Sequence, residues 1–149
     1  MIALMVSVLC TAVVAISWAI IIPKTDTQDA DAKSDAKALN FWTYRRAVVD
    51  YWNANPGATG TIPDGSLTFA SGHVRDTAWT HVIAGGQLYV YSTAATPRGT
   101  ANAIFRHGWQ SLNVGLAQAG NTMTSVTGLS SGAAIPAAIP AGAVVVIGK

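Results

Sequence analysis

The chain begins with an apolar run, MIALMVSVLCTAVVAISWAIII, in which no residue is Asp, Glu, Lys, Arg or His. An α-helix rises about 1.5 Å per residue, so a run of this length can cross the hydrocarbon core of a bilayer, which is about 30 Å thick. Its few hydroxyl side chains can bond to carbonyl groups of their own helix. Trp18 lies near one end, where aromatic side chains often meet the membrane interface. Residues 1–22 are therefore predicted to form a single-pass transmembrane anchor.

Three alternatives to an anchor compete for this run. A cleaved signal peptide would have a basic n-region, but no Lys or Arg precedes Lys24, and residues 20–22 continue the apolar run past a cleavage-like Ser-Trp-Ala at 17–19. A lipoprotein signal would place a small residue before Cys10, where Leu9 stands. A buried helix of a soluble domain rarely carries so long an apolar terminus. The anchor remains the favoured interpretation.

Charge and composition bound the classes of function. The net charge of the 149 residues is only +2, which gives no electrostatic case for binding nucleic acid. The single cysteine, Cys10, excludes an intrachain disulfide. All seven acidic residues are aspartates, and none follows Asp76. Half of the chain thus lacks a carboxylate that could act as base, orienting group or metal ligand, which argues against an enzyme.

A polar segment follows the anchor. Between residues 24 and 40, Asp and Lys alternate with Ala, and Asp29 and Lys33 form an i,i+4 pair, which favours a helix. Residues 23–38 are predicted to form a polar helical extension, with a break at Pro23 or a flexible linker as the alternatives.

From Leu39 the pattern becomes amphipathic. Tyr44, Ala47, Val48 and Tyr51 recur at the spacing of one helix face. This helix should end near Asn53, because the Pro-Gly at 56–57 disfavours further helix.

The rest of the chain predicts short elements. Asp76 is expected to cap a short helix that runs through Trp79, Val82 and Ile83 and stops at Gly85-Gly86. A second helix should follow Pro97, with Ala101, Ile104 and Phe105 buried. Strands are expected at 88–92, in a hairpin over 111–127, and at 143–147, while prolines make 133–143 an edge strand or loop. Residues 39–149 are thus predicted to be one α+β domain: the amphipathic helix packed on a small, mainly antiparallel sheet.

Two sets of residues resemble catalytic or metal sites. Gly128-Leu129-Ser130-Ser131-Gly132 matches the G-x-S-x-G nucleophile elbow, but no acid or histidine follows Ser130, so we expect a Gly/Ser loop instead. His73, His81 and His107 show no tight ligand spacing, and ordinary surface or hydrogen-bonded histidine is expected.

Aromatic and basic residues cluster on the amphipathic helix. Core packing accounts for most of the aromatic residues, and any surplus could form an assembly contact, because Trp and Tyr anchor interfaces. The Arg pair could meet an acidic partner or lipid headgroups, although a solvated helix face is the default. The candidate interaction surface consists of Trp42, Tyr44, Arg45, Arg46, Tyr51 and Trp52.

The order of several short motifs resembles that of a known family. They are Tyr44-Arg45-Arg46-Ala47-Val48-Val49-Asp50-Tyr51, Asn55-Pro56-Gly57, Gly60-Thr61-Ile62-Pro63-Asp64, Ile83-Ala84-Gly85-Gly86, Leu88-Tyr89-Val90-Tyr91, Gly132, Ile135-Pro136, Ala138-Ile139-Pro140 and Gly142-Ala143-Val144-Val145. Together with the apolar N-terminus, they resemble the PilM family of thin (type IVb) pilus biogenesis proteins, small membrane-anchored components of plasmid-type conjugative pili. The resemblance implies a non-enzymatic role in building the pilus, no cofactor, and other pilus-assembly proteins or pilin as partners; a homo-oligomer is left open.

A second similarity is to type IV pilins, which also join a long N-terminal helix to a small sheet. The chain departs from pilins because no leader precedes a Gly cleavage point and Met5 stands where the mature pilin has an acidic residue. An assembly factor is therefore preferred to a minor pilin, with a membrane-tethered serine hydrolase at Ser130 as a third hypothesis. The resemblance implies an inner-membrane protein with a periplasmic domain, whereas Lys24, Lys33 and Lys37 after the anchor favour a cytoplasmic one.

Overall fold

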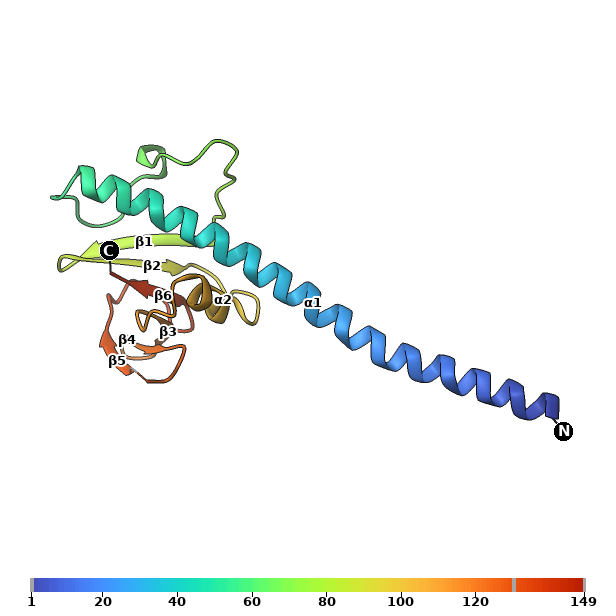
Figure 1. Ribbon diagram of the computed structural model, residues 1–149. Coiled ribbons are helices and arrows are strands. Elements are labelled where there is room, and N and C mark those ends of the chain that lie inside the picture. Colours follow the sequence, from blue (N-terminus) through green and yellow to red (C-terminus); the bar gives the residue numbers. More distant parts are fainter. Residues whose placement is uncertain (1, 130, 149) are drawn as a thin grey trace.

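The computed structural model describes the backbone of residues 2–129 and 131–148, and the side chains of residues 27–129 and 132–148. Within these residues lie two α-helices, one 3₁₀ turn and a six-stranded sheet (Figure 1). The elements are α1 (Ile2–Ala54), η1 (Asp64–Ser66), β1 (Trp79–Ala84), β2 (Gln87–Ser92), α2 (Thr100–His107), β3 (Val114–Gln118), β4 (Thr122–Ser125), β5 (Ser131–Ala134) and β6 (Val144–Ile147).

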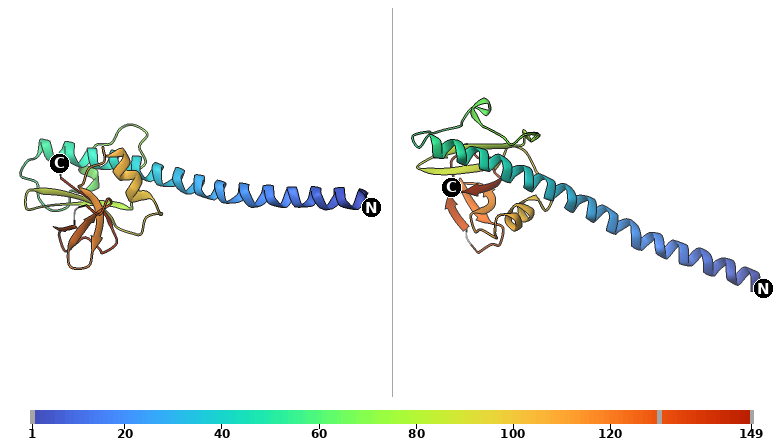
Figure 2. Two further views of the ribbon diagram at one scale, coloured as in Figure 1. Left: turned by 60° about the horizontal axis from the view of Figure 1, so that its bottom comes forward. Right: turned by 45° about the horizontal axis from the view of Figure 1, so that its top comes forward.

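Helix α1 projects far beyond the domain at its N-terminal end, while its C-terminal part lies along the sheet (Figures 1 and 2). It is continuous, so the break considered at Pro23 is absent, and the polar extension is helical. Residues 27–33 are exposed, and burial begins at Ser34 and recurs at Ala38, Phe41 and Tyr44, which is the spacing of one helix face. The predicted amphipathic helix and its end before Pro56 are confirmed.

The predicted anchor, residues 1–22, lies outside the residues whose side chains are described. Along the part of the chain with described side chains, no helix is both long and apolar enough to span a bilayer. The anchor therefore stays a prediction from the sequence.

All strand pairs in the sheet are antiparallel, and the strand order is β1-β2-β6-β3-β4-β5. The last strand along the chain, β6, thus occupies the centre, between β2 and β3. The expected strand at 88–92, the hairpin formed by β3 and β4, and the terminal apolar strand are all present. The expectation of an α+β domain with a helix on a mainly antiparallel sheet is confirmed.

The short helix predicted from Asp76 to Ile83 is wrong, because this segment forms strand β1. Gly85 and Gly86 both have positive φ (58° and 74°) and join Ala84 to its partner Gln87 in a two-residue hairpin. The Asp76 carboxylate does accept the Ala78 N–H, at 3.0 Å, but it caps a turn before the strand.

The two faces of the sheet are covered differently. Helices α1 and α2 cover one face, where the side chains of Leu88, Val90, Val144 and Val146 meet Phe41 and Ile104 in one apolar cluster. On the opposite face, segment 133–143 folds back so that Ile135 and Ile139 cover Tyr91, Met123 and Val145. The proline-rich segment therefore covers the second core, and β5 lies at the sheet edge.

Helix α2 begins at Thr100, slightly later than predicted. The Thr100 hydroxyl donates to the Pro97 carbonyl.

Candidate functional site

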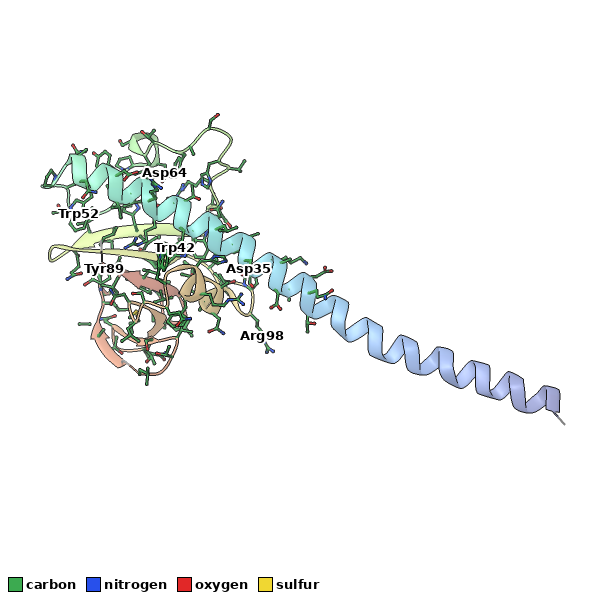
Figure 3. The ribbon with its side chains drawn as sticks, viewed as in Figure 1. Asp35, Trp42, Trp52, Asp64, Tyr89 and Arg98 are labelled. Atoms are coloured by element: carbon green, nitrogen blue, oxygen red, sulfur yellow. The ribbon has the colours of Figure 1, made fainter. Side chains whose placement is uncertain are left out.

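The six residues of the candidate interaction surface occupy different environments on α1. Tyr44 is fully buried and Trp52 is 9% exposed, so both belong to the core, in line with the packing alternative. Arg46 projects into solvent with 85% of its side chain exposed and pairs only loosely with Asp50. Figure 3 labels Trp42 where α1 approaches the sheet and α2, and Trp52 near the end of α1.

Trp42 and Arg45 line a groove of about 460 Å³ beside the loop that joins α2 to β3. Tyr51, half-buried, packs against the α1 face of the core and does not line this groove. We call this hollow the Trp109 groove, after the exposed tryptophan at its mouth. Its lining residues are Trp42, Arg45, His107, Gly108, Trp109, Ser111, Asn113, Val146 and Ile147.

Trp42 lines the groove and holds α1 against α2. Its indole N–H donates to the Ile104 carbonyl at 3.2 Å, near the end of α2. The ring lies so close to Gly108 that a Cβ there would be 2.3 Å from Trp42 Cζ2. Gly108 is thus required by the close approach of the two helices.

Arg45 lines the groove beside Trp42. Its guanidinium stacks over the Trp42 ring, 5.2 Å from the centroid, and Nη2 donates to the Gly148 carbonyl at 2.9 Å. Nε is buried and has no hydrogen-bond partner among the described residues. Burial lowers the pKa of the guanidinium from its usual value, although it stays charged at neutral pH. The site therefore holds a partly desolvated cation with unused donor capacity.

Trp109 stands at the mouth of the groove with 96% of its surface exposed. Trp109 and Gln110 both adopt left-handed backbone conformations, with φ of 57° and 55°, which are uncommon for residues other than Gly. Hydrogen bonds hold this turn, because Gln110 N–H donates to Phe105 O and Ser111 N–H donates to Gly108 O. The indole is thus presented to solvent on a fixed loop.

A second polar centre lies inside the domain around His81, which is fully buried. The Ile62 N–H donates to Nε2 at 2.9 Å, so Nδ1 carries the proton of a neutral ring and donates to the Tyr44 hydroxyl at 2.8 Å. Burial lowers the pKa of His81 to about 4. A neutral imidazole with both nitrogen atoms bonded joins α1, β1 and segment 60–62, which is a structural role.

The other histidines occupy separate places. His73 stacks on Phe69, and His107 lies 3.5 Å from the carboxylate of Asp35. Over the described part of the chain, no three His, Cys, Asp or Glu side chains converge as metal ligands would. Ser130 of the G-x-S-x-G match lies outside the described residues.

A second hollow, of about 440 Å³, lies between the start of α2 and strands β3 and β4. Small and hydroxyl-bearing residues make up most of its lining, with Arg98 at its rim. It offers neither an aromatic side chain nor a desolvated charge, so the Trp109 groove is the better candidate for an interaction site.

The chain is similar to known proteins in sequence and in fold. The sequence model of the PilM family matches residues 9–147. The chain belongs to the PilM family. PilM proteins are associated with pili, so membership links this protein to pilus biogenesis. A search of curated proteins returns no match.

Two crystal structures of PilM proteins resemble the chain. The PilM protein from Escherichia coli B7A is 19% identical, with a TM-score of 0.57 over 78% of this chain and 91% of that chain, and it shares the fold. The PilM protein from Pseudomonas aeruginosa 2192 is 28% identical, with a TM-score of 0.43 over 77% of this chain and 95% of that chain.

Proposed function

We propose that this PilM-family protein is a membrane-anchored, non-enzymatic assembly factor or scaffold of type IV (thin, conjugative-type) pilus biogenesis. It would be held in the inner membrane by residues 1–22, with the C-terminal domain in the periplasm. Its partners would be pilin or other pilus-assembly proteins, contacted through the domain surface around α1. No cofactor or nucleic acid takes part in this proposal.

The observation that carries the proposal is the arrangement along α1. One helix joins the apolar run at its N-terminal end to the core of the domain at its C-terminal end, so a partner bound to the domain would be mechanically coupled to the membrane. Residues 23–33 separate the two by about 17 Å of helix, at about 1.5 Å per residue, and the side chains of 27–33 are exposed. This is the geometry expected of a tethered scaffold.

Residue chemistry supports a non-enzymatic role. The groove contains stacked and hydrogen-bonded side chains, and its described lining has no nucleophile paired with a base. The buried His81 has both ring nitrogens engaged, so it has no free atom for proton transfer.

The test is deletion of the gene in a piliated host, followed by complementation. We expect filaments to disappear on electron micrographs and the protein to remain in the membrane fraction after shearing. Normal filaments in the deletion strain would refute a role in the pilus. Recovery of the protein along sheared filaments would favour a minor pilin subunit, an alternative that the long projecting helix also fits.

Membrane orientation needs its own test, since the basic residues after the anchor favour the opposite side. A cysteine placed at Val74, which is 82% exposed, in a Cys10→Ser background gives one accessible thiol. A membrane-impermeant maleimide should label it once the outer membrane is permeabilised. Labelling only after disruption of the inner membrane would place the domain in the cytoplasm.

The tethered-hydrolase hypothesis is tested separately by Ser130→Ala. A scaffold should tolerate this change with full piliation. Loss of piliation at normal protein level would instead favour catalysis at Ser130.

A further inference from the structure

We infer that the Trp109 groove binds a segment of another polypeptide that carries both acidic and apolar side chains. A carboxylate of that segment would pair with Arg45, and an apolar side chain would pack against Trp42 and Trp109. The inference rests on the proposed function only in expecting the segment to belong to a pilus protein. The chemistry of recognition comes from the groove itself.

The protein displays Trp109 to solvent on a strained loop. A fully exposed indole gains almost nothing from folding, because its apolar surface stays in water. Two successive non-glycine residues, Trp109 and Gln110, nevertheless hold uncommon left-handed conformations fixed by backbone hydrogen bonds. Leu112, in the same loop, is 49% exposed. An ordered, strained loop that displays an aromatic side chain is the arrangement of an interface anchor.

Arg45 is held in place and has unused hydrogen-bond donors. Its aliphatic stem and guanidinium are confined by Trp42 and by the Gly148 carbonyl, so little side-chain entropy would be lost on binding. The guanidinium has five N–H donors, and the described contacts use only one nitrogen. A carboxylate is the acceptor that matches the planar fork of a guanidinium.

The described lining of the groove offers Arg45 no acidic partner. None of the described lining residues is acidic, and the sequence has no Asp or Glu after Asp76. Asp35, which lies 3.5 Å from the lining residue His107, is already engaged by Arg106 at 2.9 Å. The groove is therefore an apolar and cationic surface whose complement is apolar and anionic.

The geometry favours a polypeptide over a lipid surface. The guanidinium belongs to a half-buried side chain that lines a concave site, whereas lipid headgroups are usually met by Lys or Arg side chains that project from a surface. The loop between α2 and β3, which contributes much of the groove's lining, belongs to the domain and is distant from the N-terminal end of α1 (Figures 1 and 2).

The binding test uses the full chain in detergent micelles. The probe is a short fluorescein-labelled peptide that alternates Asp with Phe and Leu, compared with its counterpart in which Asn replaces each Asp. Anisotropy should show at least tenfold tighter binding of the Asp peptide at low salt, and the preference should shrink as salt screens the pair.

Matched variants assign that preference to the groove. Arg45→Met should remove it, whereas Arg46→Met, at the neighbouring exposed position, should not. Trp109→Ala should weaken binding of both peptides at least tenfold. Leu129→Ala removes an apolar side chain that is also exposed, to 81%, but does not line the groove, and it should leave binding unchanged. Because Trp109 is exposed, its variant stays informative even if Arg45→Met lowers stability.

Several outcomes would overturn the inference. Equal binding of the two peptides, or equal effects of the variants and their controls, would do so. Self-association lost in Trp109→Ala without peptide binding would assign the groove to a second copy. Binding to phosphatidylglycerol vesicles, lost in Arg45→Met in place of peptide binding, would assign it to the membrane.

A cellular arm separates this inference from the proposed function. If deletion abolishes filaments, complementation with Trp109→Ala should fail and complementation with Leu129→Ala should succeed. Full rescue by Trp109→Ala would refute the groove's role and leave the pilus role intact. Normal filaments in the deletion strain would refute the pilus role, while the peptide measurements would still decide the groove.

Discussion

Gly115 in β3 has no room for a side chain. A Cβ there would lie 2.3 Å from the backbone oxygen of Thr124 and 2.7 Å from Met123 Cγ, both in the paired strand β4. We predict that Gly115→Ala lowers the free energy of unfolding by about 2 kcal/mol or more, because a backbone pair cannot move apart without breaking the ladder. Gly65→Ala, whose Cβ would meet nothing within 4 Å, should change it by less than about 0.5 kcal/mol. Equal denaturation midpoints for the two variants would contradict this.

His81 makes stability depend on pH. Its pKa is lowered by burial from 6.5 to about 4, so the folded state resists protonation that the unfolded chain accepts. The associated stability is fully present above about pH 6.5 and is lost progressively as the pH falls to 4, by about 3 kcal/mol in all. Denaturant titrations between pH 4 and 7 should reveal this slope.

The control for that slope is His81→Gln, which removes the titrating group. It should be less stable at pH 7, because Ile62 N–H and Tyr44 lose a well-placed partner, yet its stability should be flatter between pH 4 and 7. Asp76 does not interfere in this window: burial raises its pKa, but hydrogen bonds from Lys37 and Ala78 lower it below 3.8 overall, so its contribution is lost at lower pH. An unchanged slope in His81→Gln would contradict the assignment.

The same residue explains the main error of sequence-based prediction. Trp79, Val82 and Ile83 fit a helical period if His81 is taken as polar and exposed, and Asp76 and the Gly pair supply plausible ends. With His81 inside, Trp79, His81 and Ile83 alternate as a strand, which is the observed pattern. Its burial depends on Tyr44 and Ile62, which are distant in sequence, so local pattern could not have revealed it.

At the scale of elements, the contact between α1 and α2 rests on close packing at Gly108. We predict that Gly108→Ala costs about 1–3 kcal/mol, because its Cβ would overlap the Trp42 ring. Gly57→Ala, which meets nothing within 4 Å, is the control. In a Trp42→Leu background the cost of Gly108→Ala should shrink; a cost that persists in full would mean that the overlap with Trp42 is not its cause.

The ion pairs across the same contact should matter little by comparison. Asp35 is 45% exposed and pairs with Arg106, which is 61% exposed. Solvent and salt screen such a pair, so Asp35→Asn should cost less than about 1 kcal/mol. A larger loss in the free energy of unfolding, measured by thermal or chemical denaturation, would show that Asp35 stabilises the contact between α1 and α2 by more than its ion pairs.

Most elements could be predicted because their signals are local. The face of α1, the end before Pro56, strand β2 and the β3–β4 hairpin all follow from periodicity and turn residues. The central place of β6 and the cover that 133–143 forms over the second core could not, because they depend on which strands meet across the whole chain. The Trp109 groove was half predicted: Trp42 and Arg45 stood out on the helix, whereas the left-handed turn at Trp109 contains no glycine to signal it.

At the scale of the molecule, α1 divides into a part that packs on the domain and a part that does not. From Ser34 onward one face packs on the sheet and α2, whereas the side chains of residues 27–33 are exposed. The N-terminal part of α1 projects away from the domain (Figure 2). A solvated helix segment owes its stability to intrinsic propensity and local pairs, each worth only a few tenths of a kcal/mol, and not to a core. The projecting part should therefore open locally far more often than the packed part.

We predict that hydrogen exchange will divide α1 near Ser34. In the purified full chain, amides of residues 27–33 should exchange through local opening, orders of magnitude faster than those of residues 38–52, which should exchange only with unfolding of the core. Helical hydrogen bonds are present in both stretches, so the difference measures tertiary packing alone. Equal protection would mean that something covers the projecting helix in solution, and a dependence of that protection on protein concentration would identify the cover as another copy of the chain. Protection that instead rises in cells that assemble pili would place a pilus protein on this stretch of helix, in addition to the groove.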